Sequence, residues 1–252
     1  RRQRQMCIRD REKKERAFIT RVSEGTIQYM IELDYIINQF SKVKVNKMKP
    51  FIRNILRMSV YQLKYMDSVP DSAVCNEAVK LAKRKGFGSL SGFVNGVLRN
   101  ISRNLSSITY PDGQKDQIQY LSVRYSMPEW IVRQWINDYG MERTVSVLQA
   151  FLQEAPVTIR TNLLKITPEA LEMRLKEEGV TTEKIVCADM PELNYAFVNS
   201  GFDHLNALES FREGLFYVQD VSSMMVAETV APKKDSYIID VCACLLYTSP
   251  SP

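Results

Sequence analysis

Residues 217–243 read YVQDVSSMMVAETVAPKKDSYIIDVCA, and the fold of the whole chain is inferred outward from this stretch. Residues 222–230 can form a short helix, with Asp220 or Ser222 as its N-cap. Pro232 follows at a position where a helix has usually ended. Because Tyr217 reads as the end of a strand, the stretch predicts a strand end, a helix and then a second strand.

The second predicted strand covers residues 237–241, an apolar run rich in β-branched side chains. Such a run is typical of a strand buried on both faces of a parallel sheet. Asp240 lies near its carboxyl end, where doubly wound α/β enzymes bind their ligands. A sheet of this kind needs several strands, so a lone strand here is expected to be poorly sheltered.

The stretch resembles the beginning of the catalytic domain of the RNA (cytosine-5) methyltransferases, most closely the RsmB/Sun family that modifies bacterial 16S ribosomal RNA. In that family a Gln-Asp-x-Ser/Ala motif leads into a glycine loop that holds S-adenosylmethionine. The matching residues are Gln219, Asp220, Ser222, Asp240, Cys242 and Ala243. The resemblance implies that Asp240, Cys242 and Ala243 belong to an incomplete cofactor-binding loop, in which Cys242 lies against the cofactor and is not the nucleophile.

The match stops after Ala243. Residues 244–252 read CLLYTSPSP and contain no glycine, although a tight cofactor loop needs glycine. They resemble the translation of a sequencing-library adapter, and residues 1–10, RRQRQMCIRD, resemble the matching adapter. We therefore expect residues 1–11 and 244–252 to be adapter artefacts flanking a sequence cut at both ends. The alternative is a genuine tail and a genuine basic N-terminus.

The family's chemistry begins with a cysteine thiolate that attacks C6 of a cytosine, so that C5 can take the methyl group from S-adenosylmethionine. Both catalytic cysteines of the family belong to motifs downstream of the glycine loop. The resemblance therefore implies no catalytic residue within these 252 residues. We expect S-adenosylmethionine to serve the full-length parent, and this chain to bind it weakly or not at all and to be inactive.

Composition is that of an ordinary soluble globular protein, with 45% hydrophobic and 25% charged residues and a formal net charge of +5. Arg1, Arg2, Arg4 and Arg9 against Asp10 account for +3 of that charge, which leaves +2, or +1 if Arg11 is also removed. Net charge therefore says little about RNA, and an RNA-binding surface must come from local clustering of charge.

The cysteines also limit the classes of protein to which the chain can belong. Outside the two adapter-like ends they are Cys75, Cys187 and Cys242, which are widely spaced and have no CxxC pattern, so neither a metal site nor a disulfide framework is predicted. No apolar run is long enough to cross a membrane. We expect a cytoplasmic monomer without a metal.

Four helices are predicted in the first hundred residues, over 12–40, 50–66, 71–85 and from Ser89 or Ser91 to about Ile101. Pro50 suits the first turn of the second helix. Gly25 is a possible break or close-packing point, and Gly92 and Gly96 suggest that another helix passes close by. The predicted core residues are Met30, Leu33, Ile37, Phe40, Ile52, Ile55, Leu56, Val60, Leu63, Val74, Ala78, Leu81, Ala82, Phe93, Val94, Val97, Leu98 and Ile101.

The amino-acid sequence of residues 56–100 resembles that of the NusB-like RNA-binding domain found at the start of the RsmB/Sun methyltransferases. Its densest part is FVNGVLR, residues 93–99. The resemblance implies a phosphate-contacting patch, for which we name Arg84, Lys85 and Arg99, together with Arg103. The alternative is that these cations only solvate helix faces.

Residues 105–116 are polar and contain Pro111 and Gly113, which predicts an interdomain linker. Helices are predicted again over about 117–125, 128–139 and 141–153. Trp130 and Trp135 could stack on bases, but packing in a core or between domains is the favoured role.

Residues 156–162 alternate like a strand, and Thr167 with Pro168 predicts the cap and first turn of a helix to about residue 178. Further strands are predicted near 184–187 and 195–198. This α/β segment resembles the family's RNA-recognition segment, whose Arg-x-Asn-x-Leu-Lys wording is matched by Arg160, Asn162, Leu164 and Lys165. The resemblance implies RNA contacts by Arg160, Asn162 and Lys165. His204 is expected to be a loop or packing residue.

The predicted fold is a mainly α, NusB-like helical domain (12–104), a linker (105–116), a helical plus small α/β RNA-recognition segment (117–212) and the start of a Rossmann-like methyltransferase domain (213–243). The predicted function is the N-terminal part of a methyltransferase that acts on C5 of a cytosine in 16S rRNA. A non-enzymatic NusB-type RNA-binding or antitermination module is the alternative, although such a module should end near Asn104. A helical scaffold without an RNA role is a third possibility.

Overall fold

The computed structural model describes residues 13–153, 156–186, 190–202 and 204–239. The expected adapter segments 1–11 and 244–252 lie outside these residues, as do Asp240, Cys242 and Ala243. The chain divides into two compact units, residues 1–153 and residues 154–252. We call them the helical unit and the α/β unit, and each is described by itself.

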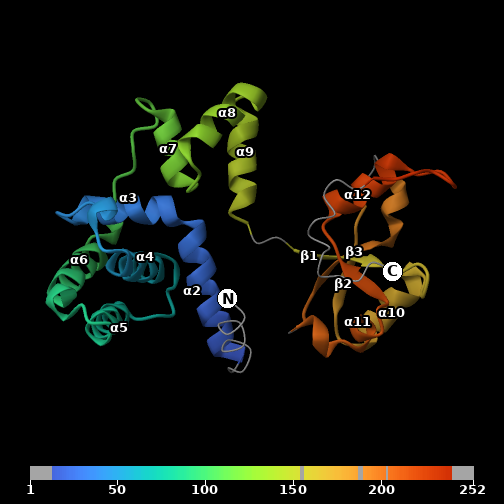
Figure 1. Cartoon of the computed structure of the whole chain (residues 1–252), viewed down its shortest axis with the longest axis horizontal. Helices are drawn as coiled ribbons and strands as arrows, with labels where there is room; N and C mark the ends of the chain where they lie inside the picture. Colours follow the sequence, from blue (N-terminus) through green and yellow to red (C-terminus); the bar gives the residue numbers. More distant parts are fainter. Residues whose placement is uncertain (1–12, 154–155, 187–189, 203, 240–252) are drawn as a thin grey trace. The chain divides into compact units, whose positions relative to one another are not determined.

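The helical unit begins with five helices that correspond to the four predicted ones (Figure 1). They are α2 (Lys13–Gln28), α3 (Met30–Phe40), α4 (Pro50–Tyr65), α5 (Asp71–Arg84) and α6 (Ser91–Arg103), with short 3₁₀ turns η1 (Val45–Lys47), η2 (Gly88–Leu90) and η3 (Leu105–Ser107). Pro50 is the first residue of α4, as predicted. Its fixed φ and missing N–H suit a first helical turn.

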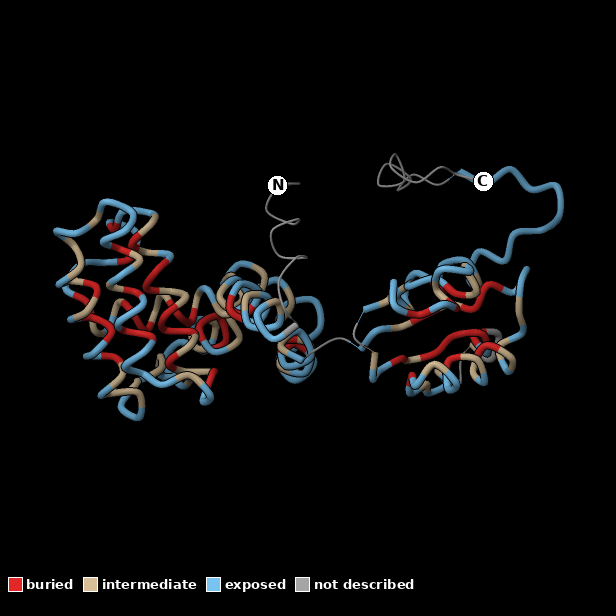
Figure 2. Tube along the Cα trace, turned by 90° about the horizontal axis from the view of Figure 1, so that it is seen from below, coloured by how far each residue is buried: buried red, intermediate tan, exposed pale blue. Residues whose placement is uncertain are grey.

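The core of this unit is made of the apolar stripes that the sequence predicts (Figure 2). Fully or almost fully buried side chains include Leu33, Ile37, Ile52, Ile55, Leu56, Val60, Val74, Ala82, Val94, Leu98 and Ile101. Leu81 and Phe93 are only half-buried and pack against the edge of this core. The three- and four-residue spacing therefore identified most of the inward positions. It is wrong for Met30, which is 39% exposed, and Phe40 is only half-buried at the edge of the core.

The first predicted helix is broken, but not at Gly25. The break lies at Tyr29, whose backbone (φ −96°, ψ 18°) separates α2 from α3. Gly25 is instead a close-packing point, because a Cβ placed there would lie 2.0 Å from Cζ of Tyr61. The expectation for Gly92 and Gly96 is wrong, since a Cβ at either position meets no atom within 4 Å.

Three further helices complete the helical unit: α7 (Gln117–Arg124), α8 (Glu129–Tyr139) and α9 (Met141–Phe151). They enclose a small core of Leu121, Val132 and Leu148. Residues 117–153 are predicted from the sequence to belong with the α/β segment that follows, but they lie in one compact unit with α2–α6. One reason is that the backbone N–H of Ile31, in the first turn of α3, donates to Oγ of Ser126 at 2.9 Å.

The tryptophans of this region have different environments. Trp135 packs into the small core and lies 5.6 Å, centroid to centroid, from Phe151. Packing is the role that the sequence favours for it. Trp130 is 67% exposed.

The α/β unit is a four-stranded antiparallel sheet with the strand order β2-β3-β1-β4. Its elements follow one another as β1 (Val157–Thr161), α10 (Pro168–Glu177), β2 (Thr181–Lys184), η4 (Pro191–Tyr195), β3 (Ala196–Ser200), η5 (Leu205–Ala207), α11 (Glu209–Arg212), β4 (Phe216–Val218) and α12 (Val221–Val230). The succession β1-α10-β2-β3-α11-β4 with this strand order is the ferredoxin-like arrangement. Thr167 caps α10 through a bond from the N–H of Ala170, as predicted.

The two faces of the sheet are covered by different helices (Figure 1). Ile159, Phe197 and Phe216 point toward α10 and α11, where Leu171 and Leu175 complete the core. Ala196, which precedes Phe197 in β3, points the other way and packs with Leu193 and Tyr195 of η4 and with Met224 of α12. This alternation is the period of two that a strand imposes on its side chains.

The structure describes residues 237–239 of the strand predicted over residues 237–241, and for these three residues the prediction is wrong. Residues 237–239 form no strand, and none of the four strands pairs with them. Tyr237 is fully exposed, and Ile238 and Ile239 are 65% and 86% exposed. An apolar run becomes a strand only if neighbouring strands accept its backbone hydrogen bonds, and no such neighbour lies among the described residues. The helix before it is correct, with Asp220 capping α12 through the N–H of Ser222.

Candidate nucleic-acid interface

The cations predicted for the NusB-like region do not form one patch. Arg84 ends α5 and Lys85 follows it, whereas Arg99 and Arg103 lie in the last turns of α6. All four side chains are exposed. A cavity that joins Arg99 and Arg103 to the first residues of α5 shows that the two helices run antiparallel. Arg84 therefore lies at the opposite end of α5, about 20 Å away along a helix of 14 residues.

The cavity at Arg99 and Arg103 has a volume of about 240 Å³ and is also lined by Asp71, Ser72, Cys75 and Ser102. Ser102 donates its hydroxyl to Asp71 Oδ2 at 2.5 Å, and Arg99 Nε donates to Asn95 Oδ1 at 3.0 Å. Residues four apart on a helix share a face, so the two guanidinium groups can act on one anion. The pair suits a phosphate group.

Cys75 at the base of this cavity is the one cysteine within the described residues, and it is buried. Burial raises the pKa of its thiol, although Arg99 opposes that shift. A thiol with a raised pKa is a poor nucleophile. The described part of the chain therefore offers no activated cysteine.

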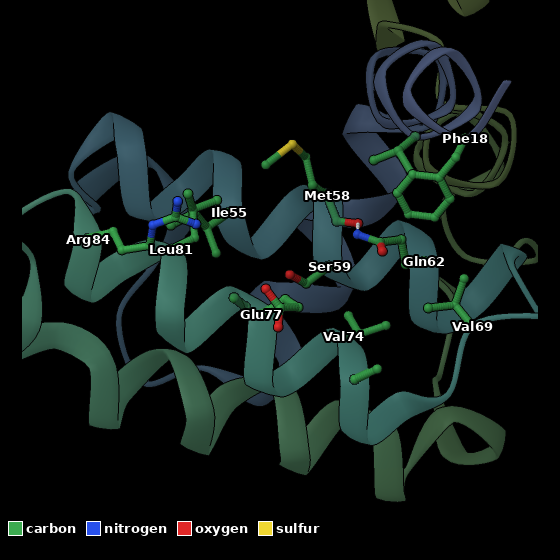
Figure 3. A pocket seen from close by; sticks show the side chains of 13 residues that line it. Phe18, Ile55, Met58, Ser59, Gln62, Val69, Val74, Glu77, Leu81 and Arg84 are labelled. Atoms are coloured by element: carbon green, nitrogen blue, oxygen red, sulfur yellow. Dashed lines mark hydrogen bonds between the residues drawn. The ribbon is translucent and has the colours of Figure 1, made fainter. Parts of the chain in front are cut away.

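Arg84 lies at the edge of a different, mainly apolar groove of about 370 Å³ between α2, α4 and α5. Figure 3 shows Arg84 at one end of this groove and Phe18 at the other. Met58, Leu81 and Val69 line its length. Besides Arg84, its polar lining side chains are Ser59, Gln62 and Glu77.

The residues predicted in the α/β unit lie at and beyond the end of β1. The Arg160 guanidinium is 5.4 Å from the centre of the Tyr195 ring, a cation–π distance. Asn162 is 8% exposed, and its amide donates to the carbonyl of Gly214 at 2.8 Å and to the Tyr217 hydroxyl at 3.1 Å. Lys165 Nζ donates to the carbonyl of Glu213 at 2.7 Å.

These contacts divide the roles of the three residues. Asn162 also accepts a bond from the N–H of Leu164 at 3.3 Å, so both ends of its amide hold the loop together. Arg160 is partly exposed and Lys165 is exposed, so both place a positive charge at the surface. Their contact with RNA stays a prediction.

Sequence reasoning missed Tyr217 as a candidate contact. Tyr217 lies opposite Arg160 in the β1–β4 register, so the two side chains share one face of the sheet. Its ring is 54% exposed, and the neighbouring Leu164 is 97% exposed. A half-exposed aromatic ring beside a guanidinium is a surface on which a base can stack. The only signal in the sequence is an aromatic residue at a strand end.

Tyr195, beneath Arg160, is held from the other side by α12. Its hydroxyl donates to Glu228 Oε1 at 2.6 Å. Burial, and then the bond to Glu228, raise the pKa of Tyr195 to about 12. Tyr195 therefore stays neutral and fixes the position of Arg160 rather than exchanging protons.

The other residues predicted to take part in chemistry are not brought together into a site within the described part of the chain. Asp240, Cys242 and Ala243, expected for the cofactor loop, lie outside the described residues. His204 is exposed and precedes η5, where its carbonyl accepts a bond from Ala207. Within the described ranges, no three His, Cys, Asp or Glu side chains gather where they could hold a metal ion. No helix in the described part of the chain is long and apolar enough to cross a membrane.

Comparison with known protein families divides the chain at a different place from the two compact units. Residues 2–103 match the NusB family, and residues 127–191 match the ferredoxin-like domain of the RsmF/B-like methyltransferases. The first match begins inside residues 1–11, so it gives no support to the expected adapter boundary. The second match joins α8 and α9 to β1 and α10, as the sequence analysis grouped them. The exact domain limits stay predictions.

Several bacterial proteins resemble almost the whole chain. The probable ribosomal RNA small subunit methyltransferase B of Bacillus subtilis is 34% identical over 90% of this chain and 49% of its own length. The probable enzyme of the same name from Synechocystis is 32% identical over 91% of this chain and 50% of its own length. The chain thus spans about half the length of these relatives.

A solved structure shares the fold. The crystal structure of PH0851 superposes with a TM-score of 0.64 at 18% identity, covering 89% of this chain and 48% of that one. The fold and the matched families define a NusB-family domain followed by an RsmF/B-like ferredoxin-like domain. Over about 90% of its length, the chain is similar to bacterial proteins named probable ribosomal RNA small subunit methyltransferase B.

Proposed function

We propose that this chain is the RNA-binding part of a methyltransferase that transfers a methyl group from S-adenosylmethionine to C5 of a cytosine in 16S rRNA. One observation carries the proposal. A NusB-family domain and an RsmF/B-like ferredoxin-like domain follow each other in one chain that aligns over 90% of its length with a probable rRNA small subunit methyltransferase B.

The described residues support an RNA-binding role through separate small groups of cations. Arg99 and Arg103 would hold one backbone phosphate, while Arg84 and Lys85 act at the far end of α5. In the α/β unit, Arg160 and Lys165 would contact the backbone, and Tyr217 would stack on a base. Asn162 would act by keeping the loop of Lys165 in shape.

The methyl donor in this proposal is S-adenosylmethionine, which supplies an electrophilic methyl group when it is bound. Asp240, Cys242 and Ala243 would belong to its loop in the whole protein. The described residues before them, 237–239, form no strand, so no sheet strand within the described residues supports such a loop from its N-terminal side. We therefore expect this chain by itself to bind the cofactor weakly or not at all and to transfer no methyl group.

The proposed setting is the cytoplasm, where ribosomal RNA is modified, and the proposed form is a monomer without a metal. A stand-alone NusB-type module is the competing function. The ferredoxin-like unit after the helical unit speaks against it, because a module of the competing kind should end near Asn104.

Two measurements test the proposal together. Binding of this chain to a 16S rRNA transcript should weaken steeply with NaCl concentration, because each neutralised phosphate releases counterions. The double variant Arg99→Gln/Arg103→Gln should bind more weakly than Lys80→Gln, which removes an exposed cation of α5 already paired with Glu77.

Methyl transfer should then be measured with the longer protein that has the length of the relatives. C5-methylcytosine in 16S rRNA would support the enzyme. RNA binding by this chain without methylation by the longer protein would favour the NusB-type module, and absence of salt-dependent RNA binding would refute both.

A further inference from the structure

The acid-free stretch of the chain that carries the most cations is not among the predicted RNA contacts. Residues 35–66 contain no Asp or Glu, and their cations are Lys42, Lys44, Lys47, Lys49, Arg53, Arg57 and Lys64. Two of these are paired: Arg57 with Asp34, and Lys64 with Glu32. The other five have no carboxylate partner in the described part of the chain.

Part of this charge surrounds a polar cavity of about 310 Å³ between α3, η1 and α4. One wall is fixed by Arg57, which donates through Nε and Nη2 to the two carboxylate oxygens of Asp34 at 2.6 and 2.5 Å. Another is fixed by Asn38, whose Oδ1 accepts a bond from the N–H of Val45 at 2.9 Å. Lys44 and Arg53 complete the charged lining. With Arg57 offset by Asp34, the cavity carries a formal charge of +2.

Arg53 carries a donor that none of the acceptors in the cavity lining engages. Its Nε is buried, yet it has no hydrogen-bond partner among the described residues. A buried donor without an acceptor is unfavourable and rare in folded proteins. The nearest carboxylate of the lining, Asp34, is already engaged by both nitrogens of Arg57. An anionic oxygen in the cavity would lie beside Arg53, which lines it and has no carboxylate partner among the described residues.

We propose that this cavity binds a phosphate group of the RNA backbone. The inference rests on the proposed RNA-binding function and adds a site to it. A guanidinium group offers a planar pair of donors that matches phosphate oxygens, and Lys44 adds a point charge at the rim. The amide of Asn38 has its oxygen occupied, which leaves its NH₂ group as a further donor.

The neighbouring lysines favour a polyanion over a single free ion. Lys42, Lys47 and Lys49 are exposed and continue the positive charge along the connection between α3 and α4. A strand of phosphates can follow such a row of cations, whereas one inorganic phosphate uses only the cavity. We therefore assign the site to RNA.

The test uses the full chain and the 16S rRNA transcript. Arg53→Gln should lower the affinity about tenfold, the loss expected for one charge-assisted hydrogen bond. It should also reduce the slope of log affinity against log salt by about 0.7 to 0.9. Asn38→Asp keeps the acceptor for the Val45 N–H but adds a negative charge to the cavity, so it should weaken binding by a similar factor.

Arg133→Gln is the matched control, because Arg133 is exposed on α8 away from the cavity and its loss changes the net charge equally. Equal effects of Arg53→Gln, Asn38→Asp and the control would overturn the site while leaving RNA binding intact. Absence of RNA binding by the unaltered chain would overturn the proposed function itself. Saturable binding of inorganic phosphate that needs Arg53, with RNA affinity independent of Arg53, would assign the cavity to a free anion and also overturn the proposal.

Discussion

Tyr110 donates its hydroxyl to Glu32 Oε1 at 2.6 Å, although the two residues are 78 positions apart. Glu32 is completely buried in α3, where it also accepts a bond from Lys64 Nζ at 2.5 Å and one from the Tyr65 hydroxyl. Burial, and then the bond to Glu32, raise the pKa of Tyr110 well above its ordinary value. The connection 105–116, predicted as a linker, is therefore attached to the helical unit by a buried carboxylate.

Replacement of Tyr110 by Phe should lower the free energy of unfolding of the helical unit by about 2 kcal/mol, because a bond to a buried charged acceptor is lost. Lys64 and Tyr65 would still hold Glu32, so the unit should remain folded. Urea unfolding followed by circular dichroism measures the change. Tyr139→Phe, at a 55% exposed site, is the control and should change stability little. Equal stability of the two variants would contradict the role of Tyr110.

Gly25 and Gly96 should respond in opposite directions to the same substitution. Gly25→Ala places a Cβ 2.0 Å from the Tyr61 ring, so overpacking should destabilise the protein by about 1–3 kcal/mol. Gly96→Ala meets open space within α6 and should stabilise by up to about 1 kcal/mol, since alanine has the higher helix propensity. Thermal unfolding of both variants gives the signs. A stabilising Gly25→Ala would show that α2 does not pack on Tyr61 as closely as described.

Asn162→Ala should destabilise the α/β unit by about 2 kcal/mol, because the carbonyl of Gly214 and the N–H of Leu164 lose their partner. Lys165→Ala should change stability much less, since Lys165 Nζ is exposed. Differential scanning calorimetry of the two variants tests this. If Asn162→Ala weakens RNA binding without lowering the unfolding temperature, Asn162 contacts RNA directly, as the sequence implies.

The raised pKa of Tyr195 predicts that the folded protein loses stability at alkaline pH. Its pKa is about 12 in the folded state against an ordinary value of 10.0, so the neutral phenol is favoured by folding. The stabilisation is fully present below pH 10 and is lost as the pH rises from 10 to 12. The phenolate absorbance of the protein minus that of Tyr195→Phe should therefore rise with a midpoint near pH 12.

Glu228→Gln removes the negative charge beside the phenol and should move that midpoint toward 10. The matched control is Glu183→Gln, which neutralises an exposed carboxylate on β2. A midpoint that is the same in Glu228→Gln and in the control would exclude the bond to Glu228 as a cause of the raised pKa.

Local signals in the sequence were sufficient for most of the elements. Pro50 at the start of α4, the Thr167 cap of α10 and the Asp220 cap of α12 were predicted because each depends on residues within one helical turn. The inward faces of α4 and α6 followed from three- and four-residue spacing for the same reason. The wording of residues 56–100 and 217–243 was enough to indicate the family, and the relatives agree.

The candidate sites depended on packing between segments that are far apart in the chain. The antiparallel packing of α5 on α6 separates Arg84 from Arg99. The meeting of α3, η1 and α4 leaves Nε of Arg53 without an acceptor among the described residues. Residues 237–239 have the composition of a buried strand but none of the neighbours that a strand needs. A sequence determines what each segment can form, because its own backbone and nearest side chains set that choice. Only the tertiary structure decides which charges meet and which polar groups are satisfied, because those energies come from partners tens of residues away.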